Sequence, residues 1–132
     1  MLSSDLINRI NNIISHSKAK HSLGIFNLSN FTTKKIPSDW NSVYFSIFIE
    51  NNKERQITGT VERGTEDIGT YLLRIGYYVG SGNNAAGFIS YKFNSNYSLD
   101  ILNATVYLNN TDYTNSSTMD IIYYTSQYVV DG

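Results

Sequence analysis

The chain has 132 residues, of which 41% are hydrophobic, 14% aromatic and only 16% charged, so it has enough apolar material for one domain with one core. Ten basic and eleven acidic side chains give a formal net charge of -1. The protein therefore lacks the overall positive field on which nucleic-acid binding depends. The absence of cysteine excludes disulfide scaffolds, thiolate zinc sites and thiol catalysis.

The first predicted element is an amphipathic helix. Between residues 4 and 17 apolar side chains recur at spacings of three and four, which is the period of an α-helix. Ser3 or Ser4 can cap the helix, and Asp5 suits the positive end of its dipole. We assign residues 1–20 to this helix and expect it to pack on the rest of the domain. Its apolar stripe consists of Leu6, Ile10, Ile13 and Ile14, and its polar face includes Asn8, Arg9, Asn12 and Ser15.

Residues 21–132 are predicted to form a single β domain. Short runs of Tyr, Ile, Phe, Val and Thr alternate with Asn, Gly and Ser, which is typical of strands joined by turns in a sandwich or barrel. Asn51-Asn52 and residues 80–84 are expected to reverse the chain. The fold class is therefore mainly β, a β-sandwich of about seven strands with the N-terminal helix packed on it. The strands are predicted near 22–29, 42–49, 56–62, 68–79, 86–93, 103–109 and 119–129.

The residues offer little material for catalysis or metal binding. The only histidines, His16 and His21, lie near the predicted helix and have no obvious catalytic partner. Three acidic residues, Glu62, Glu66 and Asp67, lack the alternating register of a calcium loop. We therefore expect a protein that is not an enzyme and has no metal or cofactor.

Tyrosine dominates the aromatic residues, with eleven Tyr against six Phe and one Trp. A tyrosine ring suits a lipid interface, and its face attracts a quaternary ammonium group. The alternative is a tyrosine-rich β core whose hydroxyls reach solvent. Adjacent tyrosines on a strand point to opposite faces, so only one member of a pair can line a common patch.

Several motifs, in the same order along the chain, resemble those of the actinoporins, the pore-forming cytolysins of sea anemones and their relatives. The amphipathic helix precedes them, as in that family. Three features depart from the family pattern: Lys92 stands where a proline is expected, Leu99 to Leu102 replaces a Trp-rich membrane-contact segment, and Met119 stands where a headgroup-binding tyrosine is expected. The motifs are Leu23-Gly24-Ile25-Phe26-Asn27, the run from Gly76 to Asn83, the run from Phe88 to Phe93, and the run from Met119 to Tyr124.

The resemblance implies a protein that binds phosphocholine headgroups of the sphingomyelin type, inserts its N-terminal helix and assembles a homo-oligomeric, cation-permeable pore. In that pore the apolar stripe would face lipid and the polar face would line water. A helix over residues 4–17 reaches only about 21 Å, against about 30 Å of hydrocarbon, so spanning needs extension through Lys20 or local thinning. The headgroup site would consist of Ser90, Tyr97, Tyr123 and Tyr124, with Ser38 and Leu72 as looser candidates.

Two other functions remain open. A non-lytic, lectin-like module of the same sandwich fold would bind glycans through a shallow polar and aromatic surface, which suits the low charge and the many Asn and Tyr residues. A self-assembling protein would use an open sheet edge. Nucleic acid is not expected as a partner. We expect a soluble form that is released without a recognisable signal peptide in this chain and acts at a target membrane, or alternatively a cytoplasmic protein.

Overall fold

The computed structural model describes residues 4–9, 18–64, 67–79 and 83–126. Three short 3-10 turns, η1 (Leu28–Asn30), η2 (Ile49–Asn51) and η3 (Thr114–Ser116), connect strands within this part of the chain. The strands are β1 (Lys18–Asn27), β2 (Lys34–Ile36), β3 (Trp40–Phe48), β4 (Gln56–Glu62), β5 (Gly69–Val79), β6 (Asn83–Phe93), β7 (Leu99–Leu108), β8 (Thr111–Asp112) and β9 (Thr118–Ser126).

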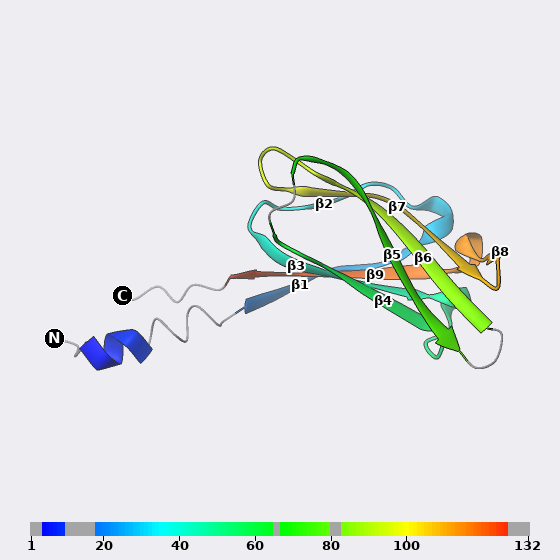
Figure 1. The fold of residues 1–132 in the computed structure, drawn as a ribbon, viewed down its shortest axis with the longest axis horizontal. Helices are drawn as coiled ribbons and strands as arrows, with labels where there is room; N and C mark the ends of the chain where they lie inside the picture. Colours follow the sequence, from blue (N-terminus) through cyan, green and yellow to red (C-terminus); the bar gives the residue numbers. More distant parts are fainter. Residues whose placement is uncertain (1–3, 10–17, 65–66, 80–82, 127–132) are drawn as a thin grey trace.

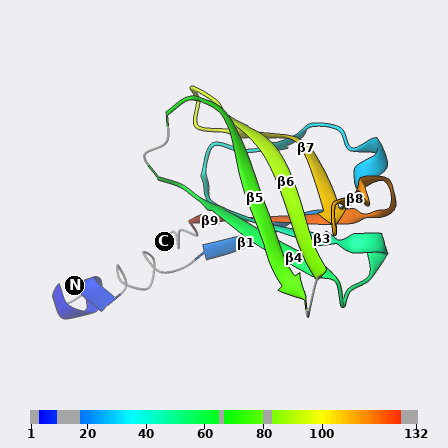
Figure 2. The same ribbon diagram turned by 45° about the vertical axis from the view of Figure 1, so that its right-hand side comes forward.

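The strands form two antiparallel sheets that pack face to face (Figures 1 and 2). The first sheet has the order β1-β9-β3-β4, and the second has the order β2-β7-β6-β5 with β8 paired to β7. This arrangement confirms the predicted fold class, a mainly β protein built as a β-sandwich with a short N-terminal helix.

The core lies between the sheets and follows from the alternation of side chains along each strand. In β9, Met119, Ile121 and Tyr123 are buried, whereas Ile122 and Tyr124, which alternate with them, are only partly buried and point outward. Each fully buried aliphatic or aromatic side chain contributes about 1.5–3 kcal/mol to stability. The largest side chains with almost no exposure are Trp40, Phe45, Ile36, Ile47, Ile49, Ile57, Ile89, Leu99, Ile101, Met119, Ile121 and Val43.

The sheets approach each other so closely that glycine is required at facing positions. A Cβ atom added to Gly59 of β4 would lie 2.1 Å from Cγ2 of Ile75, and one added to Gly87 of β6 would lie 2.9 Å from Cδ1 of Ile57. The glycines therefore leave space for large aliphatic side chains from the other sheet.

The seven predicted strands correspond to the seven long strands, and their bounds differ by a few residues. The missed strands, β2 and β8, have three and two residues, too few to show an alternating pattern. The reversal at Asn51-Asn52 is confirmed, with positive φ at Glu50 and Asn51. Val79 pairs with Asn83, so the second predicted reversal also occurs, although residues 80–82 lie outside the described part.

The boundary of the N-terminal segment is corrected by β1. Residues 18–20, which we assigned to the helix, pair with β9, beginning with Lys18 opposite Ser126. The basic residues looked like a helix C-terminus, but the backbone hydrogen bonds of a sheet outweigh this weak local preference.

The N-terminal helix is described over residues 4–9 and lies apart from the strands in both views (Figures 1 and 2). All six residues are exposed, including Leu6 at 41% and Ile7 at 44%. The described part of the helix is thus not packed on the sandwich, contrary to our expectation. Within it, the guanidinium of Arg9 lies 3.7 Å from the carboxylate of Asp5. Among the described residues no helix has the length and apolar character needed to cross a bilayer.

Candidate functional site

The predicted headgroup residues on strands lie on different faces of the molecule. Ser90 is on β6 between Leu72 of β5 and Asn103 of β7, at a position whose side chain points outward from the second sheet. Tyr124 points outward from the first sheet, where its ring meets the edge of Tyr44 at a centroid distance of 5.4 Å. Ser90 and Tyr124 therefore face opposite sides of the sandwich.

The other two predicted headgroup residues have separate surroundings. Tyr123 is 9% exposed and stacks on His21 at 4.8 Å, and His21 in turn forms a 2.9 Å hydrogen bond with the hydroxyl of Thr125. Tyr97 is 60% exposed and lies in the loop between β6 and β7. The four residues do not converge on one surface pocket, because the strand period sends Tyr123 inward and Tyr124 outward.

Only some of the predicted membrane-inserting and pore-lining residues fall within the described part of the chain. Leu6, Asn8 and Arg9 are exposed residues of the N-terminal helix. The remaining members of the two sets lie outside the described residues. They are Ile10, Asn12, Ile13, Ile14 and Ser15.

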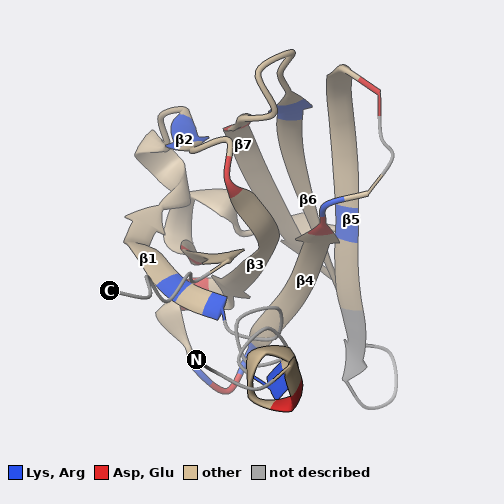
Figure 3. Ribbon diagram, turned by 90° about the vertical axis from the view of Figure 1, so that its left-hand side faces the viewer, with Lys and Arg blue, Asp and Glu red and all other residues tan. Residues whose placement is uncertain are grey.

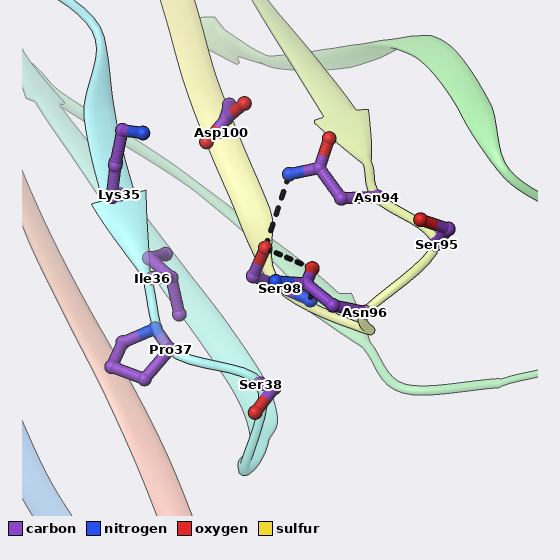
Figure 4. A pocket seen from close by; sticks show the side chains of 9 residues that line it. All are labelled: Lys35, Ile36, Pro37, Ser38, Asn94, Ser95, Asn96, Ser98 and Asp100. Atoms are coloured by element: carbon purple, nitrogen blue, oxygen red, sulfur yellow. Dashed lines mark hydrogen bonds between the residues drawn. The ribbon is translucent and has the colours of Figure 1, made fainter.

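A surface hollow lies at the end of the sandwich where β6 passes into β7 and β2 passes into β3. It has a volume of about 720 Å³. Figure 4 shows the β2 side of the hollow facing the loop that carries Asn94 and Ser95. Its lining consists of Lys35, Ile36, Pro37, Ser38, Asn94, Ser95, Asn96, Ser98 and Asp100. We call this feature the polar hollow, because all of these side chains except Ile36 and Pro37 carry a polar group.

Turn-forming residues build one wall of the polar hollow. The backbone N–H of Trp40 donates to the carbonyl of Pro37 at 3.3 Å and closes a tight turn around Ser38 and Asp39. Proline presets the φ angle of such a turn, and Ser and Asp are common within it. On the adjoining strands, Lys35 of β2 lies directly opposite Asp100 of β7 in the antiparallel register.

The opposite wall is the β6–β7 loop, residues 94–98, which contains several hydrogen bonds between its own residues. The N–H of Tyr97 donates to the carbonyl of Asn94 at 2.9 Å, and the N–H of Asn94 donates to the carbonyl of Ser98 at 3.0 Å. The Ser98 hydroxyl donates to the amide oxygen of Asn96 at 2.6 Å and accepts from the amide of Asn94 at 3.1 Å (Figure 4). These bonds fix the positions of the polar side chains that line the hollow.

Tyr97 has a backbone conformation that is unusual for a bulky residue. Its φ angle is +69°, in the left-handed region that hairpin loops usually fill with glycine. Its carbonyl accepts hydrogen bonds from Nε1 of Trp40 at 2.8 Å and from Nη2 of Arg63 at 3.3 Å. Its ring meets the edge of Phe93 at 6.1 Å, and the guanidinium of Arg63 lies 5.4 Å from the ring centroid. Such strained positions are common at binding sites, which supports a functional role for this loop.

The charges in and around the hollow are balanced. Lys35 and Asp100 are the charged residues of its lining. Figure 3 shows acidic and basic residues scattered over several strands rather than collected on one face. Among the described residues no three acidic or histidine side chains come close enough to hold a metal ion. The arrangement offers hydrogen-bond donors and acceptors more than a strong field.

A second, smaller hollow of about 280 Å³ lies on the outer face of the first sheet. Its apolar part is formed by Ile25 of β1, which is 64% exposed, and by Phe48 of β3. Asn51, Lys53 and Thr118 complete its lining. It contains none of the predicted site residues.

The sequence pointed only partly to the polar hollow. Ser38, a loose candidate for the headgroup site, lines it, and Tyr97 lies between two of its lining residues. The run Asn94-Ser95-Asn96 was a signal that could have been used, because three consecutive turn-forming polar residues separate two apolar strands. Lys35 and Arg63 carry no such signal, since only the sheet order places them near the loop.

Comparison with protein-family models, with curated proteins and with solved structures finds no match for this chain. The resemblance to the actinoporins therefore stays a prediction.

Proposed function

We propose that this protein is a glycan-binding module and that the polar hollow is its binding site. The observation that carries the proposal is the lining of the hollow, which combines three serine hydroxyls, two asparagine amides, one carboxylate and one ammonium group within about 720 Å³. Sites for apolar small molecules are lined mainly by hydrophobic side chains. A mostly polar lining suits a ligand that is itself rich in hydroxyl groups.

The chemistry of these side chains supports a sugar as the ligand. Serine hydroxyls donate and accept, asparagine amides do both through separate atoms, and a carboxylate accepts at two oxygens. A sugar presents neighbouring hydroxyls that need both kinds of partner at fixed positions. Because the β6–β7 loop is already held by its own hydrogen bonds, less conformational entropy is lost when the ligand binds.

A quaternary ammonium headgroup is a weaker candidate for this end of the molecule. The ring of Tyr97 is the exposed aromatic group here, but the guanidinium of Arg63 already lies 5.4 Å from its centroid, and Phe93 contacts the ring as well. A second cation over the same ring would be repelled by Arg63. The lining of the hollow itself contains no aromatic residue.

Asp100 offers the sharpest test of this proposal. We expect Asp100→Asn to weaken glycan binding about tenfold or more, because hydrogen bonds to a charged group contribute about 1.5–3 kcal/mol. The matched control is Asp120→Asn, an equally conservative change on the outer face of the first sheet. A glycan array would select the ligand, and isothermal titration would compare the three proteins. Absence of binding to any glycan, or equal losses in both variants, would overturn the proposal.

A second candidate is membrane insertion with pore formation, favoured by the exposure of Leu6 and Ile7 on a helix that lies apart from the sheets. An exposed apolar stripe can exchange water for acyl chains. The test is release of calcein from vesicles with and without sphingomyelin, comparing the whole chain with Leu6→Asp. Release that requires Leu6 supports this candidate, and no release from either kind of vesicle contradicts it.

A further inference from the structure

We infer that Arg63 is the positioning residue of the polar hollow: it holds the two walls in register without lining the hollow itself. The inference rests on the proposed function only where ligand binding is measured. Arg63 follows directly after β4 and is exposed. The contacts of its side chain are therefore not a consequence of burial in the core or of a position within a strand.

The guanidinium of Arg63 bonds to backbone carbonyls from both walls. Nη1 donates to the carbonyl of Trp40 at 3.0 Å, and Nη2 donates to the carbonyl of Ser38 at 2.8 Å. Nη2 also donates to the carbonyl of Tyr97 at 3.3 Å. Two of these acceptors belong to the turn after β2, and the third belongs to the β6–β7 loop.

The same guanidinium lies between two aromatic rings. Its carbon is 5.3 Å from the ring centroid of Trp40 and 5.4 Å from that of Tyr97. Trp40 is fully buried and donates from Nε1 to the carbonyl of Tyr97, so it connects the loop to the core. Arg63 and Trp40 therefore hold the same carbonyl from two directions.

These contacts explain how the loop keeps a backbone conformation that a tyrosine disfavours. The positive φ of Tyr97 places its carbonyl where both donors can reach it. Without Arg63 the loop would lose one donor and the cation beside the ring, and it would sample other conformations. Ser38, Asn96 and Ser98 line the hollow next to these contacts, so their relative positions depend on the same clamp.

A lysine in place of Arg63 cannot make the same set of contacts. The planar guanidinium directs several donors at fixed angles and stacks on rings, whereas an ammonium is a compact point charge. We therefore expect Arg63→Gln and Arg63→Lys to behave alike in positioning the loop. The matched control is Arg55→Gln in the β3–β4 turn, whose guanidinium has only a 4.0 Å ion pair with Glu50.

The experiment uses Trp40, the single tryptophan of the chain, as a reporter that needs no ligand. Its indole N–H gives one signal in a proton–nitrogen NMR spectrum. We expect hydrogen exchange of this N–H and of the Tyr97 and Ser98 amides to become about tenfold faster in both Arg63 variants, and to stay unchanged in the control, since local opening sets these rates. Unchanged exchange in both Arg63 variants overturns the inference.

Binding of the glycan selected on the array provides the second measurement. If the competent loop conformation falls to about a tenth of the population, the dissociation constant rises about tenfold. Thermal unfolding separates this effect from general destabilisation: a lowered midpoint with unchanged exchange at Trp40 would contradict a positioning role. Faster exchange in the variants of a chain that binds no glycan would support the clamp and reject the proposed function.

Discussion

Two loops of this protein have almost the same composition but different surroundings in the fold. Residues 94–98 are Asn-Ser-Asn-Tyr-Ser, and residues 113–117 are Tyr-Thr-Asn-Ser-Ser, so each contains one tyrosine among hydroxyl and amide side chains. They lie beyond opposite ends of β7 (Figure 1). The first borders the polar hollow, whereas the second contains η3 and begins with Tyr113, which packs against the core.

The difference lies in the partners of the polar groups. In the second loop the Ser117 hydroxyl is buried, donates to the Tyr113 carbonyl at 2.7 Å and accepts from the N–H of Glu50 at 3.1 Å. The Thr114 hydroxyl accepts from the N–H of Val106 at 3.0 Å. In the first loop the side chains of Asn94, Asn96 and Ser98 bond to one another, while the backbone carbonyl of Tyr97 accepts from Trp40 and Arg63. Polar groups that satisfy distant backbone stabilise the fold, and those that satisfy only their own loop stay accessible to a ligand.

The largest effect is expected from the two tyrosines of these loops. Tyr113 is partly buried and packs against the core, so Tyr113→Ala should lower the free energy of unfolding by about 2–3 kcal/mol. Tyr97 is mostly exposed, and Tyr97→Ala should cost less than about 1 kcal/mol. Urea denaturation followed by circular dichroism measures both. Similar losses would show that the loops do not differ in this way.

A smaller effect is expected from the two serines. Ser117→Ala leaves the N–H of Glu50 and the carbonyl of Tyr113 without their partner, which should cost about 1–3 kcal/mol. Ser98→Ala removes bonds within an accessible loop, where water can replace them, and should cost about 0.5 kcal/mol or less. The same urea titrations test this pair. A larger loss for Ser98→Ala would reverse the comparison.

The smallest effect concerns Asp112, just before the second loop. Hydrogen bonds from Thr114 hold the pKa of this carboxyl below its usual value, although the group is exposed to solvent. A lowered pKa adds stability above the pKa of the unfolded chain, and this stability is lost as the pH falls through the folded value. Asp112→Asn should therefore be slightly less stable than the original protein at pH 7 and equal to it in strong acid. Unfolding midpoints of the original protein and of Asp112→Asn, measured from pH 7 downward, test this expectation. A difference between the two proteins that persists in strong acid would contradict it.

Most of the fold could be predicted because strands leave a local signature. Alternation of apolar and polar residues, interrupted by Asn, Gly and Ser, located every long strand and both main reversals. The errors fell where that signature is short or ambiguous, at β2, at β8 and at residues 18–20. Residues 18–20 and β2 are defined by pairing with β9 and β7, and partners so distant in the chain are not visible in a local pattern. β8 is a two-residue return beside the end of β7, too short to alternate.

The candidate site was harder to predict. Ser90, Tyr123 and Tyr124 were grouped because similar motifs occur in a known family, but their strands belong to different sheets or their side chains point to different sides. Tyr97 and Ser38 did fall near the polar hollow. Arg63 had no signal at all, because an arginine at the end of a strand is ordinarily a solvated side chain.

The amino-acid order by itself determined the seven long strands and the two main reversals between them, since these depend on backbone sterics and on burial that alternates along each strand. Only the tertiary structure decided which polar residues meet. The sheet order brings the turn after β2, the end of β4 and the β6–β7 loop to one end of the sandwich. Hydrogen bonds across such large separations in the chain depend on how the sheets pack, and no local preference encodes them.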